Sequence, residues 1–543
     1  MMTTAPRFTG SPLRRSGQTA LAAALMVVLA GCSLTPKYER PVAPVAGQWP
    51  AGSAAAVQHQ GAAASATPWQ NFVQDERLRE IISLALENNR DLRVAIKNIE
   101  LAQAQHRITR ADIGPTLGAS FTGSRSRPNS STLPNAPTIA SNYTVGLGIS
   151  DWEIDLFGRL RALSSSALAR YLATEEARKN TQISLVGSVA SAWLNLQADN
   201  ELLALAERTL VTREQSQALT KLRLDAGVSS ALDMRQAEAL TESAKATVAQ
   251  QRRLREQDIN ALTLLVGQPI PEQLLPAVPP VEVASTGQPG AQVAVPTVSA
   301  SNTLSRFADV AVGLPSDVLL ERPDIRAAEQ QLIAANANIG AARAAFFPRV
   351  SLTGSFGRLS SEADNLFSSS SSIRVWSFGP QITLPIFDWG RLQGNLRASE
   401  ASRDIALAQY ERAIQTAFSE VANALAGRAT LGDQLTALEA QATASREAYR
   451  LSELRYRNGI ASYLQLLDAQ RTLFSAEQAL VQTRLLERLN QVALYKALGG
   501  GWTVPAAAGA ANAPAVATPA TAATTPAATA PAAAASVPAS AAP

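Results

Sequence analysis

The single cysteine of this 543-residue chain has the surroundings that best specify a chemical reaction. Cys32 follows Leu29-Ala30-Gly31, at the end of a short apolar run behind an arginine-containing N-terminus. These are the parts of a bacterial lipoprotein signal, in which cleavage before the cysteine frees its amine and its thiol takes a diacylglycerol. We therefore expect residues 1–31 to be a lipoprotein signal peptide and Cys32 to be the site of lipid attachment. The alternative, a membrane-anchor helix with a chance cysteine, needs a longer apolar run.

Charged residues stand near two glycines, Gly227 and Gly459, that interrupt long helical patterns. After Gly459, Leu464, Asp468 and Arg471 have the spacing i, i+4 and i+7, so they share one face of a helix. Two interpretations stay open from the spacing alone. One is a solvated face with an Asp468–Arg471 pair worth roughly a few tenths of a kcal/mol. The other is a charged constriction, if several copies meet at an axis.

Residues for catalysis or metal binding are scarce. The chain has two histidines, His59 in an alanine-rich stretch and His106 in a predicted helix, and one cysteine. No phosphate-binding loop, zinc-protease motif or nucleophile elbow is present, and paired His and Cys ligands are missing. A net charge of +4 without a basic stripe gives no sign of nucleic-acid binding. The sequence predicts no enzyme, no metal site and no cofactor apart from the lipid on Cys32.

The chain contains two related halves. Asp91-Leu92-Arg93-Val94-Ala95 recurs as Asp324-Ile325-Arg326-Ala327-Ala328, and the later positions keep nearly the same offset. Such agreement over a long span favours a tandem duplication over chance similarity of alanine-rich helices. Further matching positions are Pro115 with Pro348, Leu222-Arg223 with Leu454-Arg455, Gly227 with Gly459, and Gly267 with Gly499.

Each half has the same predicted order of elements. A helix stops before Pro115 or Pro348, because proline lacks an N–H and disfavours helix before it. Two runs of alternating apolar and polar residues predict a pair of strands. A stretch free of proline then predicts a helix of roughly 65 residues, about 100 Å long, followed by a glycine turn and a return helix. The fold class is therefore α+β, with long antiparallel helical hairpins and four β-strands per chain.

Composition sets the expected boundaries. The segment after Cys32 and the stretch between the halves are rich in proline and small residues, and the C-terminal end is almost entirely Ala, Pro, Thr and Val, which cannot bury a core. The expected parts are a signal peptide (1–31), a lipidated tether (32–70), a first repeat (71–268), an irregular linker (269–312), a second repeat (313–502) and a disordered tail (503–543).

Several motifs resemble those of the TolC-like outer-membrane factors of tripartite efflux systems, in particular their lipoprotein branch, the NodT/OprM-like proteins. The resemblance covers roughly Cys32 to Trp502. The motifs that carry it are Leu29-Ala30-Gly31-Cys32, Phe387-Asp388-Trp389-Gly390-Arg391, Tyr456-Arg457-Asn458-Gly459, Leu466-Leu467-Asp468-Ala469-Gln470-Arg471 and Tyr495-Lys496-Ala497-Leu498-Gly499-Gly500-Gly501-Trp502.

The resemblance implies a homotrimer in the outer membrane, lipid-anchored and extending into the periplasm. Four strands per chain are too few to close a membrane barrel, and three copies would supply a twelve-stranded one. The implied function is a passive exit duct that a periplasmic adaptor protein and an inner-membrane RND-type transporter open; the alternative is a structural coiled-coil lipoprotein spacer. The implied periplasmic gate is Asp233, Tyr456, Leu464, Asp468 and Arg471. The implied adaptor-contacting turns are Asp225, Gly227 and Val228, and Arg457, Gly459 and Ile460.

Overall fold

The computed structural model describes residues 34–50, 64, 67–127, 139–279, 304–311, 320–368, 370 and 372–502. The predicted signal peptide, Cys32 and the predicted tail 503–543 lie outside these residues. Within the described ranges, each helix is too short or too polar to cross a bilayer.

The two halves show the same order of elements. The first contains α4 (Arg90–Ala111), β1 (Leu117–Ser126), β2 (Ala140–Ile154), α5 (Arg159–Asp225) and α6 (Ala231–Val266); the second contains α8 (Pro323–Ala344), β3 (Arg349–Ser360), β4 (Ile373–Thr383), α9 (Arg391–Arg457) and α10 (Tyr463–Ala497). The helices α5 and α9 have 67 residues each. Three short additions are α2 (Trp69–Phe72), α3 (Glu76–Asn88) and η3 (Glu272–Leu274). The alternation of apolar and polar residues through Phe378, Ile382, Leu384 and Ile386 predicts a longer fourth strand than the structure shows, because β4 ends at Thr383.

The strands form one antiparallel sheet in the order β1-β2-β3-β4. The central pair, β2 and β3, approaches closely at two glycines, since a Cβ on Gly357 would stand 2.3 Å from the carbonyl oxygen of Val145. A register shift interrupts this pair between Ile149 and Trp152. Among the described residues, no strand pairs with the outer edge of β1 or of β4, so both edges present unpaired backbone groups.

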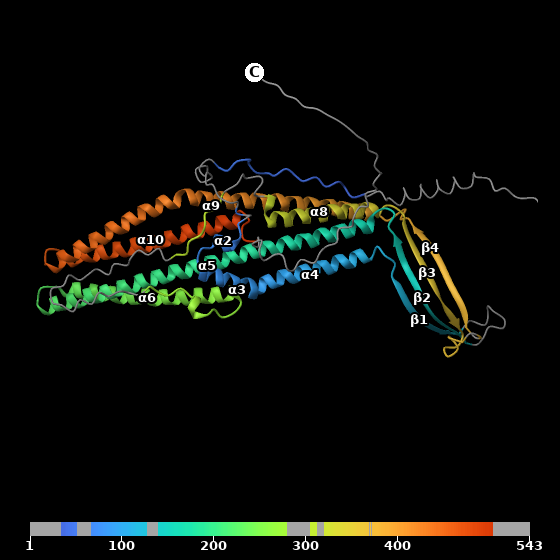
Figure 1. Ribbon diagram of the computed structural model, residues 1–543, viewed down its shortest axis with the longest axis horizontal. Helices are drawn as coiled ribbons and strands as arrows, with labels where there is room; N and C mark the ends of the chain where they lie inside the picture. The colour runs from blue at the N-terminus through green and yellow to red at the C-terminus, as the bar shows by residue number, and fades with distance from the viewer. Residues whose placement is uncertain are drawn as a thin grey trace, which may run out of the picture. The chain divides into compact units, whose positions relative to one another are not determined.

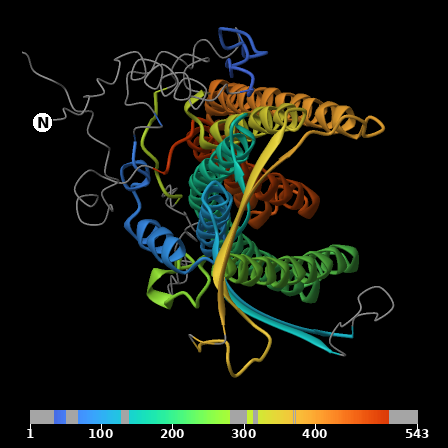
Figure 2. The ribbon, with the colours of Figure 1, turned by 90° about the vertical axis from the view of Figure 1, so that its right-hand side faces the viewer.

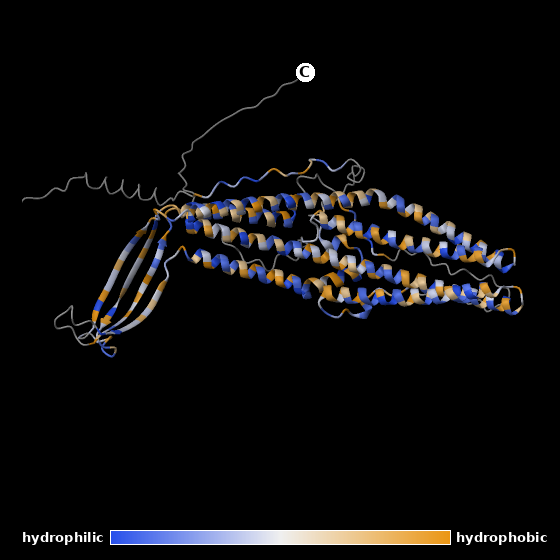
Figure 3. Ribbon diagram, turned by 180° about the vertical axis from the view of Figure 1, so that it is seen from behind, coloured by the Kyte–Doolittle hydropathy of each residue, from blue (hydrophilic) through white to orange (hydrophobic). Residues whose placement is uncertain are grey.

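The helices form two antiparallel hairpins, α5 with α6 and α9 with α10, whose turns lie at the end farthest from the sheet (Figure 1). From the sheet end, the helices lie side by side, with α4 and α8 covering parts of the two long helices (Figure 2). Apolar and polar residues are interspersed along every helix (Figure 3). Spacings of three and four residues nevertheless give α9 a narrow buried stripe, as in coiled coils: Ala406, Tyr410, Ile414, Ala417, Val421 and Ala424.

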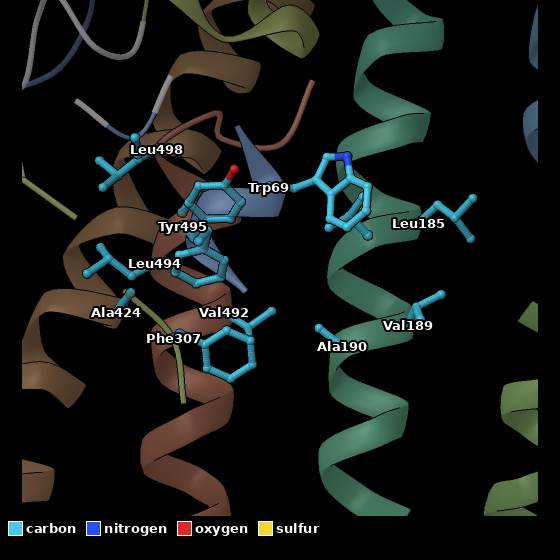
Figure 4. Packing of buried hydrophobic residues seen from close by; sticks show 14 of the residues in the cluster. Trp69, Leu185, Val189, Ala190, Phe307, Ala424, Val492, Leu494, Tyr495 and Leu498 are labelled. Atoms are coloured by element: carbon cyan, nitrogen blue, oxygen red, sulfur yellow. The ribbon is translucent and has the colours of Figure 1, made fainter. Parts of the chain in front are cut away.

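The main hydrophobic core lies where remote parts of the chain meet the long helices (Figure 4). The rings of Phe72 and Tyr495 stack with centroids 3.9 Å apart, and the Phe307 ring also stacks with that of Phe72, at 5.0 Å. The Tyr495 hydroxyl donates a hydrogen bond of 2.7 Å to the carbonyl oxygen of Thr67. The core therefore ties α2, the linker between the halves and the end of α10 together.

Residues 35–40, near the start of the described chain, are held against helix α8. Glu329 of α8 is 8% exposed and accepts two hydrogen bonds from the Arg40 guanidinium, of 2.7 and 2.8 Å, and one of 3.0 Å from the Tyr38 hydroxyl. Asn336 donates a bond of 2.8 Å to the carbonyl oxygen of Pro36. Paired, hydrogen-bonded burial is the condition under which a buried carboxylate is stable. The segment from Thr35 to Arg40, predicted as part of a tether, is thus docked along α8.

The docking of this segment depends on a missing side chain at Gly340. A Cβ there would stand 2.1 Å from the Thr35 Oγ1 atom and 2.8 Å from the Thr35 Cα atom. Overpacking of this kind costs about 1–3 kcal/mol. We expect Gly340→Ala to displace the segment and to accelerate limited trypsin cleavage after Lys37 about tenfold. Gly394→Ala in α9, where a Cβ would meet no atom within 4 Å, is the control. Equal cleavage rates in both variants would contradict the docking.

Candidate gate at the hairpin tips

Both hairpin turns are closed by a glycine in the left-handed conformation, Gly227 with φ of +75° and Gly459 with φ of +76°. The next residue in each turn donates a backbone hydrogen bond of 2.9 Å back into the helix, from Val228 to Arg223 and from Ile460 to Arg455. This is the Schellman type of helix end, which favours glycine because other residues are strained at positive φ. The glycines therefore shape the turns, and their neighbours provide the contact surface.

The residues predicted to contact an adaptor are exposed at these turns. Val228 and Ile460 each present about two thirds of an apolar side chain to solvent. Asp225 is exposed, and Arg457 holds Glu453 in an ion pair of 2.6 Å. The six predicted turn residues thus lie at the two helix turns, which are at the end of the molecule farthest from the sheet (Figure 1). Each turn has an apolar and a charged side chain.

Asp233, a predicted gate residue, caps the start of α6. Its carboxylate accepts hydrogen bonds from the Ser230 N–H at 3.2 Å and the Ser229 hydroxyl at 3.1 Å, and its own N–H donates to the Ser230 hydroxyl at 3.1 Å. Partial burial acts to raise the pKa of this carboxyl, but the hydrogen bonds from Ser230 and Ser229 outweigh it and hold the pKa below its ordinary value. The sequence Ser230-x-x-Asp233 is a capping box.

Tyr456 is 4% exposed and lies between the two hairpins. The Arg223 guanidinium stacks on its ring, 4.6 Å from the centroid, and donates a hydrogen bond of 2.9 Å to its backbone carbonyl. The Tyr456 hydroxyl is 3.4 Å from that of Thr220, and the Tyr463 ring lies 5.6 Å away. Burial and the neighbouring Tyr456 raise the pKa of Tyr463 to about 12. Contacts around one tyrosine thus tie the tip of α5 to that of α9.

Arg223 was not among the residues predicted from the sequence. Arg223 belongs to the repeated pair Leu222-Arg223 and Leu454-Arg455. The repeat indicates a duplication but does not predict which residue Arg223 contacts. Its contact with Tyr456 joins residues more than 200 positions apart, and only the packing of the hairpins reveals it.

Leu464, Asp468 and Arg471 lie on one face of α10, as the spacing predicts, and all three are exposed. Leu464 and Asp468 line a groove of about 750 Å³ between α9 and α10, together with Arg455. Within the described part of the chain, the side chains of Asp468 and Arg471 make no hydrogen bond or ion pair. The weak pair that the spacing allows is therefore absent, and both charges are available to another molecule.

The capping role of Asp233 predicts a local effect. Asp233→Ala removes the two hydrogen bonds that the carboxylate accepts at this exposed helix start, a capping loss of about 1 kcal/mol, and we expect amide exchange in the first turn of α6 to rise severalfold. Asp225→Ala, in the exposed turn, should leave that exchange unchanged. Hydrogen-exchange mass spectrometry measures both, and equal exchange in the two variants would exclude the cap.

The same cap predicts a pH dependence. Because the folded-state pKa of Asp233 is lowered, its stabilisation is present above the ordinary value of 3.8 and is lost as pH falls through the lower folded value. The difference in exchange between the protein and Asp233→Ala should therefore be constant near neutral pH and shrink as the pH falls below 3.8. A difference that grows on acidification would contradict the assignment.

Comparison with known proteins identifies the family. The model of the outer membrane efflux protein family matches residues 81–268 and again residues 314–500, once in each half. The probable efflux pump outer membrane protein TtgC of Pseudomonas putida is 47% identical over 477 residues, which cover 88% of this chain and 94% of the relative. The outer membrane protein OprJ of Pseudomonas aeruginosa is 45% identical over 487 residues, covering 90% and 96%.

A solved structure agrees. The open state of the MtrE outer membrane channel of Neisseria gonorrhoeae is 41% identical and superposes with a TM-score of 0.74, over 87% of this chain and 99% of that one. These similarities set aside the structural spacer and confirm a channel with an α+β fold that performs no enzymatic reaction. The chain belongs to the outer membrane efflux protein family and is an outer-membrane subunit of an efflux pump.

Proposed function

We propose that three copies of this chain form a passive exit duct whose inner end is closed by the tips around Gly227 and Gly459. The observation that carries the proposal is the separation of two incomplete structures. A sheet with two free edges lies at one end, and two hairpin tips with unpaired charges lie at the other (Figure 1). Further copies arranged about one axis would pair the free edges of the sheet and would bring the charged tips next to one another.

The free edges specify how the copies join. The outer edge of β4 can pair with the outer edge of β1 in the next copy, and three such junctions give a closed ring of twelve strands. A closed ring satisfies every backbone group, which is the condition for a sheet to stand in lipid. The exposed large side chains on the strands, such as Phe121, Trp376 and Phe378, then face the outer membrane.

The tips provide the gate. Threefold symmetry brings three copies of Asp468 near one axis, where the carboxylates form a negatively charged constriction and Leu464, 65% exposed, adds an apolar plug. Arg471 lies on the same face and is free to pair across the copies. Within each copy, Arg223 and Thr220 hold Tyr456 and so keep the two hairpins together.

An adaptor protein and an inner-membrane transporter open the gate. The exposed Val228 and Ile460 and the charged Asp225 and Arg457 give the adaptor apolar and charged contacts on both hairpins of a copy. Charge-assisted hydrogen bonds contribute about 1.5–3 kcal/mol each. A few such bonds are enough to hold the tips closed. The free energy of adaptor binding can exceed their sum, so this chain needs no ATP or other energy source of its own.

The gate predicts an electrical change. Replacing Arg223 by Gln and Tyr456 by Phe removes the guanidinium contacts and the hydroxyl that join the hairpins, and should raise the resting conductance of single channels in planar bilayers. Adding Asp468→Ala should also weaken block by multivalent cations, because the carboxylate ring is lost. Lys221→Gln, an exposed cation on the same helix, is the matched control.

Two outcomes would decide against this gate. If the double variant conducts like the unmodified protein, the contact of Arg223 with Tyr456 is only structural. If Asp468→Ala leaves cation block unchanged, Asp468 is a solvated surface charge. The other predicted gate residue, Asp233, is expected to act through its cap on α6 and to leave cation block unaffected.

We also propose that Cys32 carries the lipid and that residues 35–40 set its position. Three peptide units separate Cys32 from Thr35, which is docked against Gly340, so the Cα atom of the lipidated residue can lie no more than about 11 Å from that of Thr35. Gly340 stands one turn before the end of α8, which leads into β3. The anchor and the strands would then enter the same membrane.

Lipidation is tested by mass spectrometry of the mature N-terminus. The expected product begins at Cys32 and carries acyl chains, and Cys32→Ala, exported with a replacement signal peptide, should lack them. Because the strands insert by themselves, this variant should keep its conductance. An unmodified N-terminus upstream of Cys32 in the wild-type protein would disprove lipidation.

A further inference from the structure

A small cavity lies between the two hairpins, farther from the tips than Tyr456. Its volume is about 50 Å³, which is room for roughly three water molecules. Arg208 and Arg213 of α5 line one side of it, and Arg446 of α9 and Glu477 of α10 line the other. It is thus walled by both hairpins and by both halves of the duplicated chain.

The cavity carries an excess of positive charge. Among the described residues that line it, three are arginines and one, Glu477, is acidic. Glu477 accepts a hydrogen bond of 2.6 Å from Arg446 and a long one of 3.4 Å from Arg208. One carboxylate therefore serves two guanidiniums, and Arg213 faces the cavity without an acidic partner in the lining.

Arg213 has spare donors. One terminal nitrogen donates a hydrogen bond of 3.0 Å to the carbonyl oxygen of Leu240, whereas its Nε atom is buried and has no hydrogen-bond partner. Burial lowers the pKa of Arg208 and of Arg213; it outweighs the opposing effects of Glu477 on Arg208 and of Tyr463 on Arg213, and the neighbouring Arg446 and Arg471 act in the same direction as burial. An arginine stays charged in a protein, so this crowding is a cost that an anion would relieve.

We propose that this cavity binds a small inorganic oxyanion of the phosphate class, held by Arg208 and Arg213 on one hairpin and by Arg446 on the other. The planar guanidinium fork presents paired donors that match the oxygens of such an anion. Gln470 also lines the cavity; its amide nitrogen donates one hydrogen to the Ser216 hydroxyl at 3.1 Å and keeps a second hydrogen as a neutral donor. The volume suits an ion of this size and excludes the larger cargo of an efflux duct.

The position of the site gives it a regulatory role, which rests on the proposed gate. An anion that bonds to α5 and α9 together adds a second tie between the hairpins, beyond the contact of Arg223 with Tyr456. It binds best when the hairpins lie as they do here, so it stabilises this arrangement in proportion to its difference in affinity between closed and separated hairpins. Occupancy should therefore oppose opening.

Binding is measured by equilibrium dialysis of the detergent-solubilised full-length protein with radiolabelled phosphate, at constant ionic strength in gluconate. We expect saturable uptake of one phosphate per chain. Arg213→Gln should weaken the affinity about tenfold or more, because it removes one charge-assisted contact. Arg252→Gln is the matched control, since Arg252 pairs with Glu207 on an exposed surface outside the cavity.

A third variant separates binding from damage to the fold. Glu477→Gln removes the carboxylate that competes for Arg208 and Arg446, and it should raise the affinity for phosphate, which misfolding cannot do. Absence of saturable uptake would show a cavity filled by water only, and uptake that Arg213→Gln and Glu477→Gln leave unchanged would show that phosphate binds elsewhere on the protein. Either result would overturn the proposal.

Regulation is tested separately by single-channel recording with phosphate or gluconate at equal ionic strength. Phosphate should lower the resting conductance of the wild-type protein and leave that of Arg213→Gln unchanged. If phosphate binds without lowering the conductance, the regulatory role is overturned, but the assignment of the binding site still holds. A failure of the gate itself appears instead in gluconate, as a normal conductance of the variant with Arg223→Gln and Tyr456→Phe.

Discussion

The unpaired backbone at the two edges of the four-stranded sheet is the constraint on which the rest of the molecule depends. Every N–H and C=O group on those edges needs a partner, and in lipid only another strand can supply it. Pairing with further copies fixes an axis, and the axis then decides where the long helices of each copy stand. In the proposed gate, the same axis, continued along 67-residue helices, would bring the tips of different copies together far from the sheet.

The hairpin tips are held together by different interactions from those in the middle of the chain. The core around Tyr495 is continuous and apolar, whereas the cluster around Tyr456 is small and consists largely of tyrosines. Toward the tips, the hairpins are joined by hydrogen bonds and by charges that are incompletely matched. Tight packing resists a change of arrangement, but a few polar contacts can be exchanged for others. This difference in packing supports the proposal that the hairpins can separate at their tips, while the apolar core near Tyr495 holds the middle of the chain together.

Much of the fold could be read from the sequence because local rules determine it. Proline ends α4 and α8, glycine ends α5 and α9, and alternation marks the strands, so element order and the repeat could be predicted. The capping role of Asp233 could also be predicted from Ser230, three residues before it, because Ser-x-x-Asp at a helix start is a capping pattern. The break between α3 and α4 at Asn89, whose side chain caps α4, was also a local signal. By contrast, the contacts of Tyr456 with Arg223, and of Glu329 with Arg40, join distant residues, and no spacing rule specifies them.

The placement of charge explains how a duct without a fuel can still be regulated. A micromolar complex with a partner supplies about 8 kcal/mol, while each contact between the hairpins contributes about 1.5–3 kcal/mol. A gate held by many such contacts would stay closed, and one held by none would leak. In the proposed gate, the two arginine contact sites, at Tyr456 and at Glu477, would place the closed state between these limits. If the proposed anion binds among the guanidiniums at the second site, a solute would adjust the strength of that contact, and the duct could be held shut when idle and still yield to its partners.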